Sequence, residues 1–121
     1  MNKKKILVVD DEPQLAGFVK MRLEANNFEV AVASDGRDGL KKVSENKPDL
    51  IILDILMPNL DGFSMLAKLR EDEETKSLPV IILTAKDTPD SVAKALKLGA
   101  NDYIVKPFEA RVLLEKIRRL V

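Results

Sequence analysis

The sequence predicts an α/β protein: a doubly wound, five-stranded parallel sheet with five helices distributed over both faces. Two observations lead to this fold class. Five short apolar runs recur along the 121 residues, and a segment with helical periodicity follows each of them. Strands that alternate with helices form parallel sheets, because each helix carries the chain back across the sheet. We therefore expect five strand–helix units in a single domain over residues 1–121.

The five expected strands are short and aliphatic. Three of them consist almost entirely of Ile, Leu and Val, which is typical of strands covered on both faces. The expected ranges are 6–9, 30–33, 50–53, 80–83 and 103–105. Doubly wound sheets of five strands commonly take the order 2-1-3-4-5, with a ligand crevice between strands 1 and 3.

The five expected helices are marked by apolar residues spaced three or four apart, which places them on one helical face. Asp61 is expected to cap the third helix, and Asp87 or Thr88 the fourth, with Pro89 in its first turn. The apolar faces, in chain order, are Leu15, Phe18, Val19 and Leu23; Leu40 and Val43; Phe63, Leu66 and Leu69; Val92, Ala95 and Leu96; and Leu113, Ile117 and Leu120.

Composition excludes several classes of protein. The chain has no cysteine and no histidine, so disulfides and thiolate or imidazole metal sites are ruled out, and any metal must be held by oxygen. Lys plus Arg and Asp plus Glu both number 20, and this zero net charge gives no reason to expect direct nucleic-acid binding. The apolar run at residues 6–9 is too short for a signal peptide, and no stretch would cross a membrane. We expect a cytoplasmic protein.

Reactive side chains follow four of the five expected strands. Strand 1 is followed by Asp10 and Asp11, and strand 3 by Asp54. Strand 4 ends in Thr84, and Lys106 follows strand 5. Because the carboxyl ends of parallel strands meet at one edge of the sheet, these residues are expected to lie together.

The charges of this set favour a metal site. Asp10, Asp11 and Asp54 carry three negative charges, and Lys106 offsets only one. A divalent cation would neutralise the remainder, and oxygen ligation favours Mg²⁺, with Mn²⁺ as a substitute. Lys106 and the Thr84 hydroxyl could then donate to phosphoryl oxygens. Each residue taken singly is more often a cap, a turn or a strand end, but their coincidence at one edge favours a functional site.

The motifs that contain these residues resemble the receiver domain of two-component response regulators, of the chemotaxis-regulator type with a flavodoxin-like fold. The resemblance extends from about residue 4 to the last residue. The matching segments are Val-Val-Asp10-Asp11-Glu12, Asp54-Ile-Leu-Met57-Pro58-Asn-Leu-Asp61-Gly62, Leu-Thr84-Ala85 and Gly99-Ala-Asn-Asp102-Tyr103-Ile-Val-Lys106-Pro107-Phe108.

The resemblance implies a role for each residue of the site. Asp54 would accept a phosphoryl group from a phosphohistidine of a sensor histidine kinase, or from a small phosphodonor. Asp11 would bind Mg²⁺ directly and Asp10 directly or through water, with Asp54 and the backbone carbonyl of Leu56 completing the protein ligands. Lys106 would pair with the phosphoryl group.

The resemblance also implies a switch. Thr84 would move toward the phosphoryl group and Tyr103 would turn inward, which changes the face of the fourth helix, fifth strand and fifth helix for an output domain or target. The peptide bond between Lys106 and Pro107 is expected to be cis. Leu56 and Ala85 would flank the phosphoryl group, and since neither can orient a water molecule, we predict slow self-dephosphorylation.

The same face is a candidate for a phosphorylation-dependent homodimer. Lys94 and Arg111 match basic positions that support such dimers in transcription-factor receivers. Lys97 and Val112 depart from the acidic residues usual nearby. A solvated lysine face is the alternative interpretation.

Three other functions are alternatives to the receiver interpretation. A phosphatase with a nucleophilic aspartate normally has a second aspartate two residues later, where this chain has Leu56. A flavodoxin-like nucleotide or flavin binder would need a glycine-rich loop after strand 1, where this chain has Asp10-Asp11-Glu12-Pro13. A degenerate receiver that works without phosphate would not need the complete set of site residues.

Overall fold

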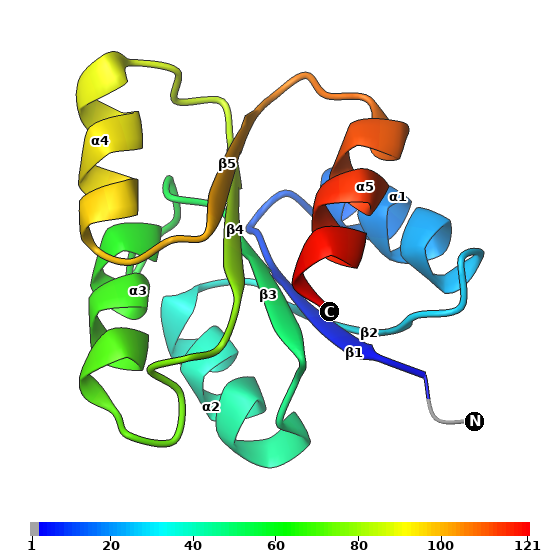
Figure 1. The fold of residues 1–121 in the computed structure, drawn as a ribbon, viewed down its shortest axis with the longest axis horizontal. Helices are drawn as coiled ribbons and strands as arrows, with labels where there is room; N and C mark the ends of the chain where they lie inside the picture. The colour runs from blue at the N-terminus through cyan, green and yellow to red at the C-terminus, as the bar shows by residue number, and fades with distance from the viewer. Residues whose placement is uncertain (1–2) are drawn as a thin grey trace.

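A computed structural model describes residues 3–121, so the first two residues of the predicted domain lie outside the described residues. Five parallel strands form one sheet in the order β2-β1-β3-β4-β5, which confirms the predicted order (Figure 1). The strands are β1 (Lys5–Val9), β2 (Glu29–Ala33), β3 (Leu50–Leu53), β4 (Val80–Thr84) and β5 (Asp102–Val105). Each boundary lies within one residue of its predicted position.

Five helices cover the two faces of the sheet (Figure 1). They are α1 (Pro13–Glu24), α2 (Gly36–Asn46), α3 (Gly62–Glu71), α4 (Pro89–Lys97) and α5 (Ala110–Leu120). Helices α1 and α5 pack on one face, and α2, α3 and α4 on the other. In the part of the chain that the structure describes, no helix has both the length and the apolar character needed to cross a bilayer.

The central strands are aliphatic at every position because both faces are covered. In β1, Ile6 and Val8 contribute to the core beneath α1 and α5, whereas Leu7 and Val9 contribute to the core beneath α2, α3 and α4. Successive side chains of a strand point to opposite faces, so continuous burial needs apolar residues throughout. In the central strands β1, β3 and β4, polar residues therefore occur only at the ends.

Capping side chains fix the loops that enter the helices. Asp61 accepts a hydrogen bond from the Ser64 amide at the start of α3, and Thr88 accepts one from the Ser91 amide at the start of α4. Both caps confirm the sequence prediction, with Thr88 rather than Asp87 serving α4. Leu96, expected on the packed face of α4, is half exposed.

Candidate functional site

Strand register brings the predicted site residues to one edge of the sheet. Val9 of β1 is paired with Leu53 of β3, so Asp10 and Asp54 leave the sheet side by side. The amide of Asp54 donates to the carbonyl of Val9 at 2.9 Å. Lys106 follows β5 directly, and its amide donates to the carbonyl of Thr84 at 2.8 Å.

The ammonium group of Lys106 joins three carboxylates at this edge. Its Nζ lies 2.9 Å from Oδ2 of Asp10, 3.0 Å from Oδ2 of Asp54 and 3.0 Å from Oε1 of Glu12. The side chains of Asp10 and Asp54 are each 4% exposed, that of Lys106 is 11% exposed and that of Glu12 is 61% exposed. The centre of the site is therefore two buried carboxylates held by one cation, with a third carboxylate at the solvent side.

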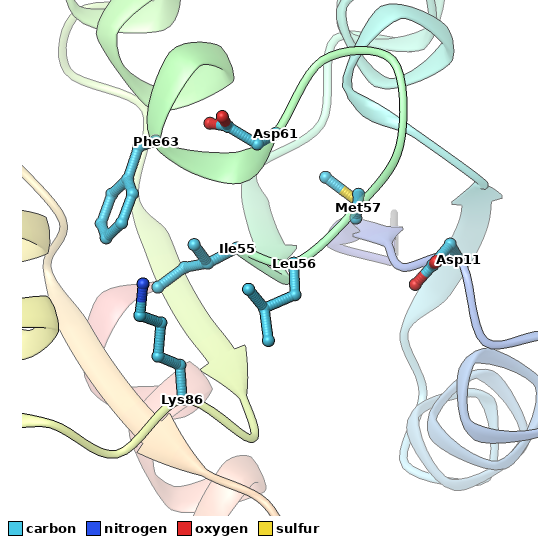
Figure 2. Close-up of a pocket in the computed structure, with 7 residues that line it drawn as sticks. All are labelled: Asp11, Ile55, Leu56, Met57, Asp61, Phe63 and Lys86. Carbon is cyan, nitrogen blue, oxygen red and sulfur yellow. The ribbon is translucent and has the colours of Figure 1, made fainter.

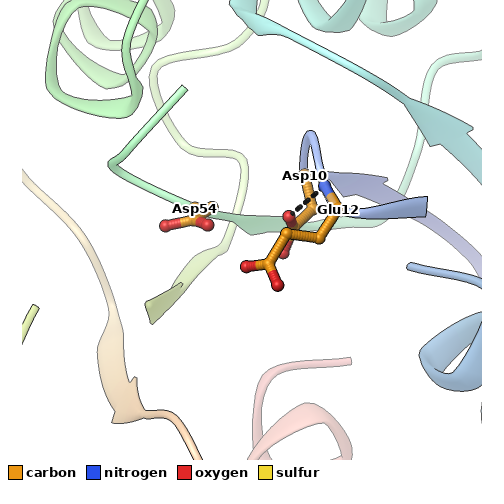
Figure 3. Close-up of side chains that lie close together, drawn as sticks. All are labelled: Asp10, Glu12 and Asp54. Atoms are coloured by element: carbon orange, nitrogen blue, oxygen red, sulfur yellow. Dashed lines mark hydrogen bonds between the residues drawn. The ribbon is translucent and has the colours of Figure 1, made fainter. Parts of the chain in front are cut away.

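Backbone amides hold the other oxygens of the two buried carboxylates. The Glu12 amide donates to Oδ1 of Asp10 at 2.9 Å, and the Leu56 amide donates to Oδ1 of Asp54 at 3.1 Å. Figure 3 shows the three side chains beyond the strand ends, with Glu12 next to Asp10 and Asp54 after the neighbouring strand. Both buried carboxyl groups are thus fixed in orientation by one backbone donor and one lysine donor.

The pKa directions at this centre follow from burial and charge. Burial raises the pKa of Asp10, and this outweighs the lowering by the Glu12 amide and Lys106. Burial alone would lower the pKa of Lys106, but its hydrogen bonds to Asp10, Glu12 and Asp54 outweigh that effect and raise it. Lys106 is therefore a cation throughout the neutral range, and its single ammonium group contacts three carboxyl groups at this centre.

The grouping of carboxylates differs in one member from the predicted metal ligands. Carboxylate oxygens of Asp10, Glu12 and Asp54 lie within 4.8 Å of one another. Asp11 instead lines a neighbouring hollow together with Leu56 and other residues of the loop after β3 (Figure 2). The structure thus brings Asp10 and Asp54 together directly and places Asp11 at the hollow that Leu56 also lines.

Thr84 and Tyr103 contact the same backbone segment. The Thr84 side chain is fully buried, and its Oγ1 accepts a long hydrogen bond of 3.4 Å from the Lys86 amide. The Tyr103 hydroxyl donates to the Lys86 carbonyl at 2.6 Å. Burial, with the negative charges of Asp54 and Asp87, raises the pKa of Tyr103. The loop after β4 therefore connects the two predicted switch residues.

The two predicted flanking residues lie at different hollows. Leu56 is 53% exposed and lines the hollow with Asp11 and Lys86, as Figure 2 shows. Ala85 lines a second hollow with Glu12 and Lys106. The peptide bond between Lys106 and Pro107 is cis, as expected.

Two residues of the site were missed by sequence reasoning. Glu12 belongs to the quoted motif, but its pairing with Lys106, 94 residues away, was not anticipated. Lys86 was the second: its backbone carbonyl accepts from Tyr103, and its side chain lines the same hollow as Leu56, with the ammonium end near Ile55 and Phe63 (Figure 2). The acidic residue that directly precedes the Pro13 start of α1 was the available signal for Glu12.

Comparison with known families decides the family to which the chain belongs. The family described as response regulator receiver domain matches residues 6–118. The chain belongs to this family. Receiver domains are phosphoacceptor regulators of two-component signalling rather than conventional enzymes, and membership favours this interpretation over the phosphatase and flavin-binder alternatives.

Similar proteins agree with the receiver assignment. The response regulator ArlR of Staphylococcus saprophyticus is 46% identical over 118 residues, which cover 97% of this chain and 52% of that protein. The alkaline phosphatase synthesis transcriptional regulatory protein PhoP of Bacillus subtilis is 41% identical over 121 residues, which cover all of this chain and 49% of that protein. This receiver domain therefore spans about half the length of the curated relatives it matches.

A solved structure shows the same fold. The chemotaxis protein CheY4 of Vibrio cholerae superimposes with a TM-score of 0.92 at 32% identity, covering 98% of this chain and 99% of that one. This similarity confirms the chemotaxis-regulator-like, flavodoxin-like architecture predicted for the receiver domain.

Proposed function

We propose that Asp54 accepts a phosphoryl group from a phosphohistidine of a sensor histidine kinase, in a Mg²⁺-dependent reaction. The observation that carries this proposal is the buried pair of Asp10 and Asp54 joined by Lys106 at the carboxyl edge of the sheet. A carboxylate that is buried, oriented by the Leu56 amide and paired with a fixed cation is prepared for in-line attack on phosphorus.

The transfer exchanges one bond to phosphorus for another. A new bond forms between an Asp54 carboxylate oxygen and phosphorus, and the bond between phosphorus and the histidine nitrogen breaks. Lys106 pairs with a phosphoryl oxygen, and the Thr84 hydroxyl donates to another. Water later hydrolyses the acyl phosphate and restores the free carboxylate, so the protein is a switch with autocatalytic phosphotransfer.

The donor set fits a hard divalent cation. We assign Asp10, Asp11 and Asp54 as carboxylate ligands, with the Leu56 backbone carbonyl as a fourth protein ligand, and the cation as Mg²⁺ or Mn²⁺. The carboxylates of Asp10, Glu12 and Asp54 all contact Lys106, which supplies only one positive charge, so a divalent cation held beside them by Asp10, Asp11 and Asp54 would reduce their mutual repulsion. When bound, the ion screens the repulsion between the carboxylate and the phosphoryl group.

Phosphorylation is proposed to change the face formed by α4, β5 and α5. The support is the path from Thr84 through the Lys86 backbone to the Tyr103 hydroxyl. A phosphoryl group that draws Thr84 toward it would alter this path and shift the population of the two arrangements. The changed face would act on an output domain or a target protein in the cytoplasm, with no direct contact to nucleic acid or membrane.

Intact mass measurement tests the proposed chemistry. With a small phosphodonor and Mg²⁺, the wild-type protein is expected to gain the mass of one phosphoryl group, and without Mg²⁺ it is expected to gain none. Asp54→Ala should remain unmodified because the attacking carboxylate is gone, whereas Asp90→Ala, an exposed aspartate in the first turn of α4, should be modified like wild type. An adduct on Asp54→Ala would overturn the assignment.

Self-dephosphorylation is expected to be slow and to depend on residue 56. Leu56 is exposed beside the site and offers no group to orient an attacking water. A polar side chain in Leu56→Asn or Leu56→Gln is expected to accelerate decay of the phosphorylated protein several-fold, read by mass over time. Met21→Asn, at an exposed apolar residue of α1 outside the α4, β5 and α5 face, is the control. Unchanged decay across the Leu56 substitutions would remove this role.

The face of α4, β5 and α5 is also our candidate for a phosphorylation-dependent homodimer. In the single chain, Nζ of Lys94 lies 4.4 Å from the centre of the Phe63 ring, and Arg111 pairs with Glu109, the N-cap of α5, and with Glu115 within α5. Sedimentation is expected to show a doubled mass after phosphorylation, with Arg111→Ala reducing it. A monomer mass in both states would eliminate the dimer.

A further inference from the structure

Glu12 accepts a hydrogen bond from the third N–H group of Lys106, the lysine proposed to pair with the phosphoryl group. An ammonium group has three N–H donors. In Lys106 these meet three carboxylate acceptors, Asp10, Asp54 and Glu12, at 2.9 to 3.0 Å. In this arrangement Lys106 has no remaining N–H for an incoming phosphoryl oxygen, so one carboxylate must leave before Lys106 can pair with the phosphoryl group.

The three carboxylates differ in how easily they can leave. Asp10 and Asp54 are buried, and each has its second oxygen fixed by a backbone amide. Glu12 has a side chain that is 61% exposed, and its carboxylate can turn into water at low cost because exposed ion pairs are weak. Glu12 is therefore the partner that Lys106 releases.

The start of α1 explains why the Glu12 side chain reaches Lys106. Glu12 is the N-cap residue of α1, but its side chain makes no capping hydrogen bond. Its own amide is held by Asp10, and Pro13 begins the helix after it. Because the backbone is held on both sides, the Glu12 side chain starts at the edge of the sheet beside Asp10 (Figure 3), within reach of Lys106 and free to turn away from it.

We propose that Glu12 is a gate on phosphoryl entry: its carboxylate occupies the Lys106 donor that the phosphoryl group needs, and phosphorylation displaces it. This inference rests on the proposed roles of Asp54 and Lys106. Glu12 also places a negative charge beside the hollow that it lines with Ala85 and Lys106. The gate therefore discriminates against phosphodonors with a higher negative charge, since these meet more repulsion.

Phosphorylation rates of Glu12 variants test the gate. Glu12→Gln and Glu12→Ala are expected to form the phosphoryl adduct about two- to fivefold faster with acetyl phosphate at low ionic strength, the factor expected for loss of an exposed ion pair. The gain should be smaller with phosphoramidate, which carries less negative charge, and should shrink as salt screens the interaction. If Glu12 had a purely structural role, the gain in rate would depend neither on the phosphodonor nor on the salt concentration.

A second glutamate provides the matched control. Glu109 is the N-cap of α5, makes no capping hydrogen bond and is similarly exposed, but it pairs with Arg111 rather than Lys106. Glu109→Gln is expected to react at the wild-type rate. Glu12→Asp keeps the charge but shortens the side chain, so it should behave like Glu12→Gln if the contact with Lys106 is what blocks entry.

The outcomes separate this inference from the function on which it rests. The gate would be overturned if wild-type protein formed the adduct at the same rate as Glu12→Gln. It would also be overturned if Glu12→Asp reacted at the wild-type rate. Either outcome would leave the role of Asp54 intact. A slower Glu12→Gln would also overturn the gate. Wild-type protein that forms no adduct under any condition would remove the proposed function itself.

Discussion

Replacing Lys106 by methionine is expected to lower the free energy of unfolding of the metal-free protein by about 3 kcal/mol. The substitution keeps most of the side-chain volume but removes the cation that joins Asp10 and Asp54. Two buried carboxylates would then face each other without a counter-charge, and either ionising both or protonating one costs free energy. Urea unfolding at neutral pH in the presence of a chelator measures the loss.

Added Mg²⁺ should recover part of this loss, because a divalent cation replaces the missing positive charge. The control is Lys116→Met, which removes a lysine 2.9 Å from Asp102. That pair is partly exposed, so its loss is expected to cost less than about 1 kcal/mol. Equal destabilisation of the two variants would contradict the assignment of Lys106 as the cation that holds the buried centre.

The contribution of Lys106 should also appear in the pH dependence of the free energy of unfolding. The pKa of Lys106 is raised above its ordinary value of 10.5, so its contribution is complete below that pH and is lost as pH rises through the folded-state pKa. Lys106→Met should lack this alkaline loss. Asp10 changes stability in the same direction but in the acid range: its pKa is raised from 3.8 by burial, so the cost of its ionised form is relieved, and stability rises, as pH falls through the folded-state value toward 3.8.

The sequence predicted the centre of the site because parallel strands fix where their ends lie. Once the apolar runs were recognised as strands, Asp54 and Lys106 had to leave the sheet at the same edge. Aliphatic strands buried on both faces leave little freedom in register, since each side chain must remain in its layer. Asp10 was predictable for the same reason.

Glu12 and Lys86 were not predictable on these grounds. Glu12 lies beyond its strand, and its contact with Lys106 depends on where α1 begins and on the direction that Pro13 sets. Lys86 binds Tyr103 through a backbone carbonyl, which every residue possesses, so residue type carries no signal. Helical periodicity predicted that Leu96 packs against the sheet, and this was wrong. The buried residues of α4 are the small Ser91 and Ala95, and Leu96 is half exposed.

Replacing Gly62 by alanine is expected to lower the free energy of unfolding by about 2–3 kcal/mol, the range of overpacked positions. A Cβ at Gly62 would lie 2.2 Å from the backbone oxygen of Asp54 and 2.7 Å from the Cα of Ile55. Both are backbone atoms, and the Gly62 amide also donates to the Ile55 carbonyl, so neither side can move alone. The start of α3 must shift away from the segment that carries Asp54.

The expected loss at Gly62 should be accompanied by slower phosphorylation, since the displaced segment holds the Asp54 carboxylate and the Leu56 amide that orients it. Gly17→Ala is the matched control: Gly17 lies within α1 with nothing within 4 Å of an added Cβ. There the same methyl group should raise stability by about 0.5–1 kcal/mol, because alanine favours the helix. Chemical unfolding is therefore expected to show a lower free energy of unfolding for Gly62→Ala and a higher one for Gly17→Ala. Destabilisation of similar size at both positions would show that helix α3 does not rely on this close approach to hold the Asp54 segment in place.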